Sequence, residues 1–220
     1  MGERGASDFS KIFSPILADL LRVEKVRGRI QERVNKAIAH CRKSVSSTHR
    51  GDFAVSEAEL ERAKAELSKI ARLSENSPQL LGWNLVNSAY QEYVEAALLL
   101  CVGKGAGMPS PKKLSAPPTA FLLGAADLVG ELRRMVVNAI RSGETSEAEE
   151  LYHRMVEMFE HISRFPLSDS MVPGLRRKVD QARYMLEETN ALLAEERGRR
   201  ELMRQMEETR RFMESKKPSR

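Results

Sequence analysis

The chain has 220 residues, enough for one sizeable domain, and 41% of them are hydrophobic while only 5% are aromatic. Its 36 Lys and Arg residues exceed its 31 Asp and Glu residues, and the net charge of +5 permits a nucleic acid or an anionic surface as partner without requiring one. The first residues lack the apolar core of a signal peptide, and no run approaches the roughly 18 apolar residues of a membrane span, so we expect a soluble, cytoplasmic protein with no membrane partner. The two cysteines form no CxxC motif, which argues against a zinc site and fits a reducing compartment.

Apolar residues recur with helical spacing along the chain, so we expect about six to seven helices, no strand and an all-α fold. The first helix is expected over about residues 14–48. Lys and Arg follow its polar side, either as a solvated face or as a stripe that contacts the phosphates of a nucleic acid. The candidate phosphate contacts on this helix are Arg29, Arg33, Lys36, Arg42 and Lys43.

A turn at residues 51–52 leads to a second helix, which a capping box of Ser56 and Glu59 is expected to open. Pro78 should open the third helix, because proline is favoured in the first helical turn. Residues 103–118 are rich in Gly, Pro, Lys and Ser, and we expect them to form a loop within one domain.

The second half of the chain is expected to hold three more helices, over about residues 119–141, from Thr145 to about residue 165, and from near Pro173. Beyond residue 195 the sequence is dense in mixed charge and poor in apolar residues. We therefore expect one helical domain over residues 1–195 and a charged extension, helical or frayed, over residues 196–220. A coiled-coil contact through the extension is a weaker alternative.

Glu92 and Glu95 lie three residues apart on the third expected helix, so their side chains project from neighbouring points of one face. On a helical wheel, Glu92 falls in the middle of the apolar stripe of this helix and Glu95 lies on the flank. A carboxylate that faces a core is costly unless something compensates for it. A metal ion, an Arg side chain or a raised pKa would each do so.

Asp127 and Glu131 share one face of the fourth expected helix, opposite its apolar residues, so solvent exposure is one interpretation of this pair. Against it, like charges one turn apart repel by about a few tenths of a kcal/mol unless a cation bridges them. Gly124 and Gly130 beside them also indicate that a backbone or a ligand comes close.

The four acids are the best candidates for chemistry, because no Ser/His/Asp or Cys/His arrangement and no glycine-rich nucleotide loop occurs in the sequence. Carboxylate oxygens suit Mg²⁺ or Mn²⁺, which bind through a few carboxylates together with substrate phosphates. Such an ion polarises a phosphoryl oxygen and activates a bound water for phosphodiester hydrolysis. The candidate metal ligands and catalytic residues are Glu92, Glu95, Asp127 and Glu131.

Two blocks of the sequence resemble the translin family, and within it the branch of translin-associated factor X. They are residues 84–95, with the core QEYVEA, and residues 121–140, FLLGAADLVGELRRMVVNAI, followed by Ser-Gly-Glu. The resemblance runs from about Lys36 to Thr189. It implies an antiparallel helical bundle of six to seven helices whose copies assemble into a closed octameric barrel that encloses RNA.

The resemblance also implies the catalytic subunit of an Mg²⁺-dependent endoribonuclease that cuts single-stranded RNA and nicks a strand of short RNA duplexes. The catalytic acids of that branch match Glu92, Glu95, Asp127 and Glu131, a set that the translin branch itself lacks. The loop at residues 103–118 is shorter than in the animal proteins, and the charged extension has no counterpart there. These departures suggest a prokaryotic, archaeal version that forms a homo-octamer without a separate translin subunit.

In such a barrel the basic face of the first helix would line the inner surface, with Arg134 as a further phosphate contact. Two alternatives stay open. One is a non-catalytic barrel that binds RNA or single-stranded DNA, in which the acids pair with Arg134 or with a neighbouring chain. The other is a helical scaffold whose charged extension recruits partners, and the basic first helix argues against it.

Overall fold

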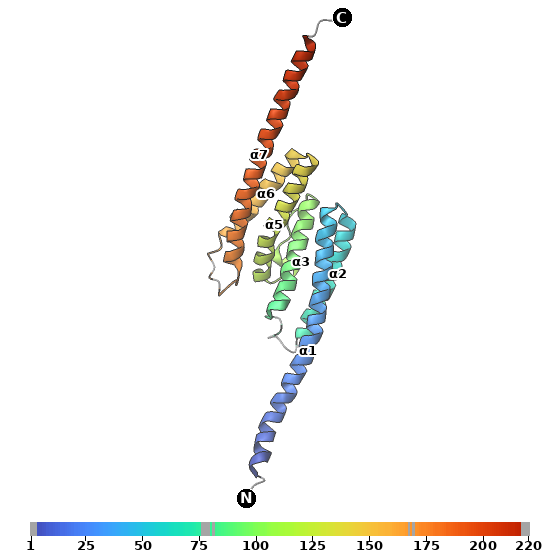
Figure 1. Ribbon diagram of the computed structural model, residues 1–220. Coiled ribbons are helices and arrows are strands. Elements are labelled where there is room, and N and C mark those ends of the chain that lie inside the picture. The colour runs from blue at the N-terminus through green and yellow to red at the C-terminus, as the bar shows by residue number, and fades with distance from the viewer. Residues whose placement is uncertain (1–3, 76–79, 81, 167, 169, 217–220) are drawn as a thin grey trace. The chain divides into compact units, whose positions relative to one another are not determined.

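The computed structural model describes residues 4–75, 80, 82–166, 168 and 170–216. These residues form seven helices and no strand, so the expected all-α fold is confirmed (Figure 1). The helices are α1 (Arg4–His49), α2 (Phe53–Ser74), α3 (Asn84–Gly103), α4 (Pro111–Leu114), α5 (Pro118–Ser142), α6 (Thr145–Ser163) and α7 (Leu175–Ser215).

The chain divides into two compact units, Met1–Gly124 and Ala125–Arg220, and the division falls within α5. In the first unit α1, α2 and α3 lie side by side (Figure 1). Their shared core consists of apolar residues with helical spacing, each exposed by 3% or less. Those on α1 are Ile30, Val34, Ala37 and Cys41, those on α2 are Ala63, Leu67 and Ile70, and those on α3 include Ala89, Val94, Ala96 and Leu99.

Helix α1 begins at Arg4, about ten residues before the expected start, and continues through Pro15. The apolar positions of its buried half recur at alternating steps of three and four residues, and the same spacing continues towards the N-terminus. There, however, the large apolar side chains are at least half exposed in this single chain. They are Phe9, Ile12, Phe13, Ile16, Leu17, Leu20 and Leu21, and we call them the α1 apolar stripe.

The expectation that Ser56 caps α2 is wrong. The helix begins three residues earlier, at Phe53, and Ser56 is fully buried within its first turn. Its hydroxyl is hydrogen-bonded to the hydroxyls of Ser44 and Thr48 on α1, each at 2.8 Å. Ser56 therefore serves in a tertiary contact between α1 and α2, although its spacing to Glu59 matches that of a capping box.

The described part of α3 begins at Asn84, and the proposed helix start at Pro78 lies outside the described residues. Trp83 precedes the helix, and the guanidinium of Arg27 on α1 stacks over its ring at 4.8 Å from the centroid. The segment after α3 is not wholly irregular, because Pro111–Leu114 forms one helical turn. The Ser110 hydroxyl accepts a hydrogen bond from the Lys113 amide and opens that turn.

In the second unit α6 begins at Thr145 as expected, and α7 packs along it through an apolar stripe that ends at Leu193. Polar contacts add to this packing, because the guanidinium of Arg197 makes two hydrogen bonds to the carboxylate of Glu149. Arg200 donates a further hydrogen bond of 2.6 Å to the carbonyl of Gly143. The apolar stripe and these polar contacts together fix α7 within the second unit as far as Arg200.

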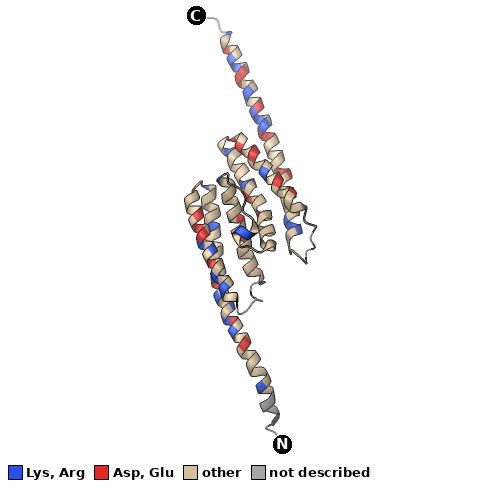
Figure 2. Ribbon diagram, turned by 180° about the vertical axis from the view of Figure 1, so that it is seen from behind, with Lys and Arg blue, Asp and Glu red and all other residues tan. Residues whose placement is uncertain are grey.

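The charged extension is helical as far as Ser215, and from residue 201 to residue 216 every residue is exposed. Basic residues and glutamates are interspersed along it (Figure 2). Many of them form ion pairs three or four residues apart, such as Arg204 with Glu201 and Glu208. None of the described helices is both long and apolar enough to cross a membrane.

Candidate functional site

Glu92 and Glu95 lie in the middle of α3 and are both half-buried, as their place on the helical wheel predicts. They lie close to Cys41, a fully buried residue of α1. Burial raises the pKa of the Cys41 thiol to about 12, and the negative charges of Glu92 and Glu95 contribute to that shift. The pair therefore belongs to the face of α3 that is turned towards α1.

The backbone of α3 is also approached closely by α5, at Gly124. A Cβ atom on this glycine would lie 2.6 Å from the carbonyl oxygen of Gln91 and 2.8 Å from the Cβ of Val94. Such distances leave no room for a side chain, so the expectation of a close backbone approach at Gly124 is confirmed. The contact fixes the start of α5 against the turn of α3 that carries the two glutamates.

Asp127, in the second unit, is partly buried, with 23% of its side chain exposed. The ammonium of Lys178 on α7, itself only 17% exposed, donates a hydrogen bond to its carboxylate. The simple interpretation that Asp127 faces solvent is therefore wrong. A cation already lies at this carboxylate, and it comes from a residue 51 positions further along the chain.

Glu131 is equally shielded, with 23% of its side chain exposed, and Arg134 lies one turn away on the same helix at 3.6 Å. This is the pairing that the non-catalytic alternative expects of Arg134. A Cβ atom on Gly130 would find its nearest neighbour, the sulfur of Met185, at an ordinary contact distance of 3.8 Å. Of the two glycines, only Gly124 is thus in a place where a side chain would collide.

In the part of the chain that the structure describes, no three His, Cys, Asp or Glu side chains gather into a set that could hold a metal ion by themselves. The carboxylates are present as two pairs, one on α3 and one on α5. Mg²⁺ commonly binds to one or two carboxylates and completes its shell with water and substrate phosphates. Paired carboxylates suit that mode of binding.

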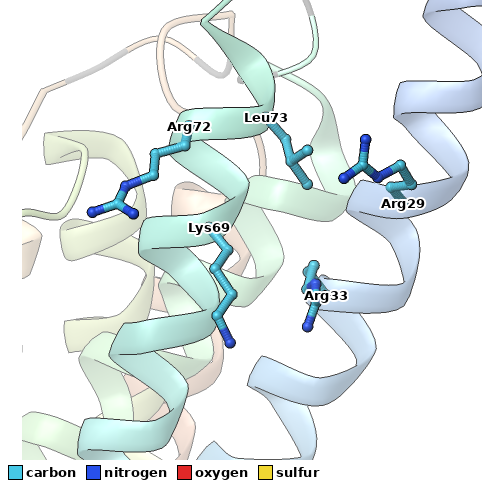
Figure 3. A pocket seen from close by; sticks show the side chains of 5 residues that line it. All are labelled: Arg29, Arg33, Lys69, Arg72 and Leu73. Carbon is cyan, nitrogen blue, oxygen red and sulfur yellow. The ribbon is translucent and has the colours of Figure 1, made fainter.

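Two of the predicted phosphate contacts, Arg29 and Arg33, line a pocket between α1 and α2 with a volume of about 210 Å³ (Figure 3). The other residues of the pocket, Lys69, Arg72 and Leu73, come from α2 and were missed in the sequence. Their spacing in the sequence does not indicate a binding site, because two cations and one leucine within about a turn occur on many exposed helix faces. Only the packing of α1 on α2 brings the four cations together.

The remaining predicted contacts do not line this pocket. Lys36 is paired with Glu32 on α1 at 2.6 Å, and Arg42 and Lys43 are exposed further along the same helix. Arg134 belongs to the second unit and is paired with Glu131. Of the six predicted phosphate contacts, Arg29 and Arg33 are thus the two that line this pocket.

The chain is similar to solved structures of AfC3PO. For AfC3PO in complex with duplex RNA the sequence identity is 28% and the TM-score 0.76, with 86% of this chain and 97% of that chain covered. For the crystal structure of AfC3PO the values are 29% and 0.78, with 86% and 98% covered. Apo-NeC3PO, at 18% identity, a TM-score of 0.75 and coverage of 84% and 96%, shares the fold.

Among curated proteins the chain is similar to an uncharacterised protein of Methanocaldococcus jannaschii, with 29% identity over 175 residues that cover 78% of this chain and 76% of the relative. Residues 79–193, just over half of the chain, match the Translin family. This stretch includes both carboxylate pairs and the whole of α5 and α6. The chain belongs to the translin family.

Proposed function

We propose that this protein is an Mg²⁺-dependent endoribonuclease of the branch that resembles translin-associated factor X. The observation that carries the proposal is that both carboxylate pairs, one on α3 and one on α5, are partly buried. Partial burial of a carboxylate is costly unless the acid has a partner, so it distinguishes these four acids from residues that only face solvent. The similarity to AfC3PO, which was solved in complex with duplex RNA, supports RNA as the substrate class.

The carboxylates fit the proposed ion in their chemistry. Glu92 and Glu95 offer hard oxygen donors one turn apart, and the cation at Asp127 is an exchangeable ammonium that a divalent ion of higher charge could replace. Mg²⁺, or Mn²⁺ in its place, would supply a polarised phosphoryl oxygen and a bound water of lowered pKa. The residues proposed to hold it are Glu92, Glu95, Asp127 and Glu131.

In the proposed reaction, water adds to the phosphorus of one phosphodiester, and the bond from phosphorus to the leaving ribose oxygen breaks. One of the four carboxylates accepts the proton of the water, and the leaving oxygen takes up a proton in turn. The ammonium of Lys178 beside Asp127 would lie next to the phosphate and offset part of its charge. The residues of α1 that were assigned to phosphate contact would hold the rest of the strand.

We further propose that copies of the chain assemble into a homo-octameric barrel around the RNA. The α1 apolar stripe supports assembly, because its side chains continue the spacing of a buried face and yet are at least half exposed in the single chain. A second copy is the simplest cover for it, and in the translin family such assembly is expected from the resemblance described above.

A non-catalytic protein that binds RNA or single-stranded DNA is the second candidate, and the contacts of Asp127 and Glu131 favour it. Each of these two acids already has a cationic neighbour within the chain, as a purely structural acid would. Under this alternative, added metal has no effect on RNA.

Cleavage of a labelled short RNA, single-stranded or in a duplex, separates the two candidates. The wild type should cut with Mg²⁺ or Mn²⁺ and not with EDTA, whereas Glu92→Gln and Asp127→Asn should bind RNA without cutting it. Glu61→Gln, which changes an exposed acid of α2, is the matched control and should cut normally. Full activity of Glu92→Gln, or binding without cleavage by the wild type under every condition, would reject the nuclease.

A further inference from the structure

The pocket between α1 and α2 is lined by four cationic side chains and one leucine. Arg29 and Arg33 are one turn apart on α1, and Lys69 and Arg72 are one turn apart on α2. Figure 3 shows the guanidinium of Arg29 reaching towards Leu73 of α2, with Arg33 further along α1 and Arg72 extending away from α1. The volume of about 210 Å³ corresponds to about seven water molecules at about 30 Å³ each, which is room for a small hydrated anion.

One carboxylate serves two of the four cations. Glu66, exposed by only 8%, accepts hydrogen bonds from Arg33 at 3.2 Å and from Lys69 at 2.6 Å. Burial acts to raise the pKa of this carboxyl, but the hydrogen bonds from Lys69 and Arg33 outweigh it and hold the pKa below the usual value. Glu66 is therefore ionised at neutral pH.

Within the described residues, Arg29 and Arg72 take part in no ion pair. The four lining cations thus share one paired carboxylate, that of Glu66. The charge of Glu32 also acts on Arg33, but Glu32 is itself paired with Lys36, so the cations around the pocket exceed the carboxylates. Crowding like charges around a cavity is unfavourable unless an anion shares it, and the attraction for such an anion is strongest where cations converge from two sides.

We propose that this pocket binds the terminal phosphate of an RNA strand, in preference to a phosphate within the strand. An internal phosphodiester carries a single negative charge, whereas a terminal phosphate carries about −1.5 to −2 at pH 7 and has three free oxygens for hydrogen bonds. Arg29 and Arg72 are the two lining cations that have no ion pair within the described residues. Arg29 already reaches between the helices, and the exposed side chain of Arg72, which extends away from α1 in Figure 3, would turn towards the bound phosphate. The apolar side chain of Leu73 offers a wall for the sugar of the last nucleotide.

This inference rests on RNA being the ligand of the protein, and it adds a second point of contact at a strand end. A free nucleoside monophosphate or inorganic phosphate has the same anionic group. The difference is that the rest of the strand would add contacts along the exposed cations of α1, so a phosphorylated strand should bind more tightly than either small anion.

The test compares the binding of three labelled short RNAs of one sequence, with a 5′-phosphate, a 3′-phosphate or hydroxyl groups at both ends, measured by fluorescence anisotropy with EDTA present. We expect one of the phosphorylated RNAs to bind the wild type about tenfold more tightly than the unphosphorylated RNA, as one charge-assisted contact allows. Arg29→Gln and Arg72→Gln should each abolish this preference. Arg72→Gln should keep the affinity for the unphosphorylated RNA within about twofold, whereas Arg29→Gln should also weaken the binding of all three RNAs, because Arg29 is a proposed contact along the strand as well. Lys64→Gln, which removes an exposed cation of α2 outside the pocket, should keep the preference.

Equal affinity of the wild type for all three RNAs would overturn the inference and leave RNA binding intact. Loss of the preference in Lys64→Gln as well would also overturn it, because a diffuse charge effect would then suffice. A nucleoside monophosphate or inorganic phosphate that binds as tightly as the phosphorylated RNA would show that the ligand is a small anion and not a strand end. No binding of any RNA would reject the proposed function itself. Circular dichroism of each variant verifies that the helices are retained.

Discussion

Gly124 of α5 lies against the carbonyl of Gln91 of α3 so closely that a Cβ on the glycine would be 2.6 Å from the oxygen. We expect Gly124→Ala to lower the free energy of unfolding by about 1–3 kcal/mol, because the backbone of one helix would have to move. Gly130→Ala is the matched control on the same helix. There the nearest atom is 3.8 Å away, and the better helix propensity of alanine should leave stability unchanged or raise it by up to about 1 kcal/mol. Urea unfolding of both variants measures the difference, and equal effects would contradict the close contact.

The six longer helices and their order could be predicted from the sequence because the apolar spacing that defines them is local, whereas the single turn α4 lies in a segment that was predicted to be a loop. The half-buried position of Glu92 could be predicted for the same reason, since it depends only on the wheel of one helix. The partner of Asp127 could not, because Lys178 is brought to it by the packing of α7. The role of Ser56 was mistaken in the same way, since its hydrogen-bond partners Ser44 and Thr48 lie on α1 and reach it only through the packing of α1 on α2.

The ammonium of Lys178 is paired with the carboxylate of Asp127, so the proposed metal ion would have to compete with it there. Lys178→Ala should leave a partly buried carboxylate without this partner and destabilise the protein by about 1–3 kcal/mol in EDTA. If Asp127 is a metal ligand, Mg²⁺ should restore much of this loss, so that the rise in Tm on adding Mg²⁺ is larger in Lys178→Ala than in the wild type.

Arg177→Ala removes an exposed cation from the same turn of α7 and serves as the control for the Lys178 experiment. Its melting temperature and its response to Mg²⁺ should match the wild type. A Tm of Lys178→Ala that is indifferent to Mg²⁺ would favour the non-catalytic alternative, in which Asp127 is a structural partner of the lysine.

Stability at acid pH should depend on Glu66. In the folded protein the pKa of Glu66 is lower than the unfolded value of about 4.3. The ionised carboxylate therefore stabilises the fold at neutral pH. This contribution is lost as the pH falls from about 4.3 through the folded pKa. Glu66→Gln should therefore be less stable than the wild type at pH 7 and should lose less stability between about pH 5 and pH 3. Denaturant unfolding at a series of pH values measures both slopes, with Glu61→Gln as an exposed control on the same helix. Parallel pH profiles for Glu66→Gln and the wild type would contradict the prediction.

The reactivity of the Cys41 thiol should show whether α1 and α3 stay packed together around it. Burial, with the charges of Glu92 and Glu95, raises the pKa of its thiol to about 12, so at pH 8 it is protonated and out of reach. In a Cys101→Ser background, a chromogenic disulfide reagent should label Cys41 only when denaturant unfolds the protein. Adding Glu92→Gln should lower the pKa of this thiol, as followed by thiolate absorbance. Rapid labelling of the native protein would mean that α1 and α3 separate readily there.

The α1 apolar stripe should decide whether copies of the chain associate. Leu20 is 62% exposed and Phe13 is 61% exposed in the single chain, and both continue the spacing that is buried further along α1. An aspartate at either position would have to be desolvated in an apolar interface, at a cost that a single-chain fold would not incur. We therefore expect Phe13→Asp and Leu20→Asp to reduce the molar mass measured by light scattering at micromolar concentration, with an unchanged helical circular dichroism spectrum. Lys25→Glu changes the charge of the same exposed half of α1 outside the stripe and should leave the mass as it is. If both aspartate variants retain the mass of the wild type, the stripe is not the contact between copies, and the assembly proposed here would have to form through other surfaces.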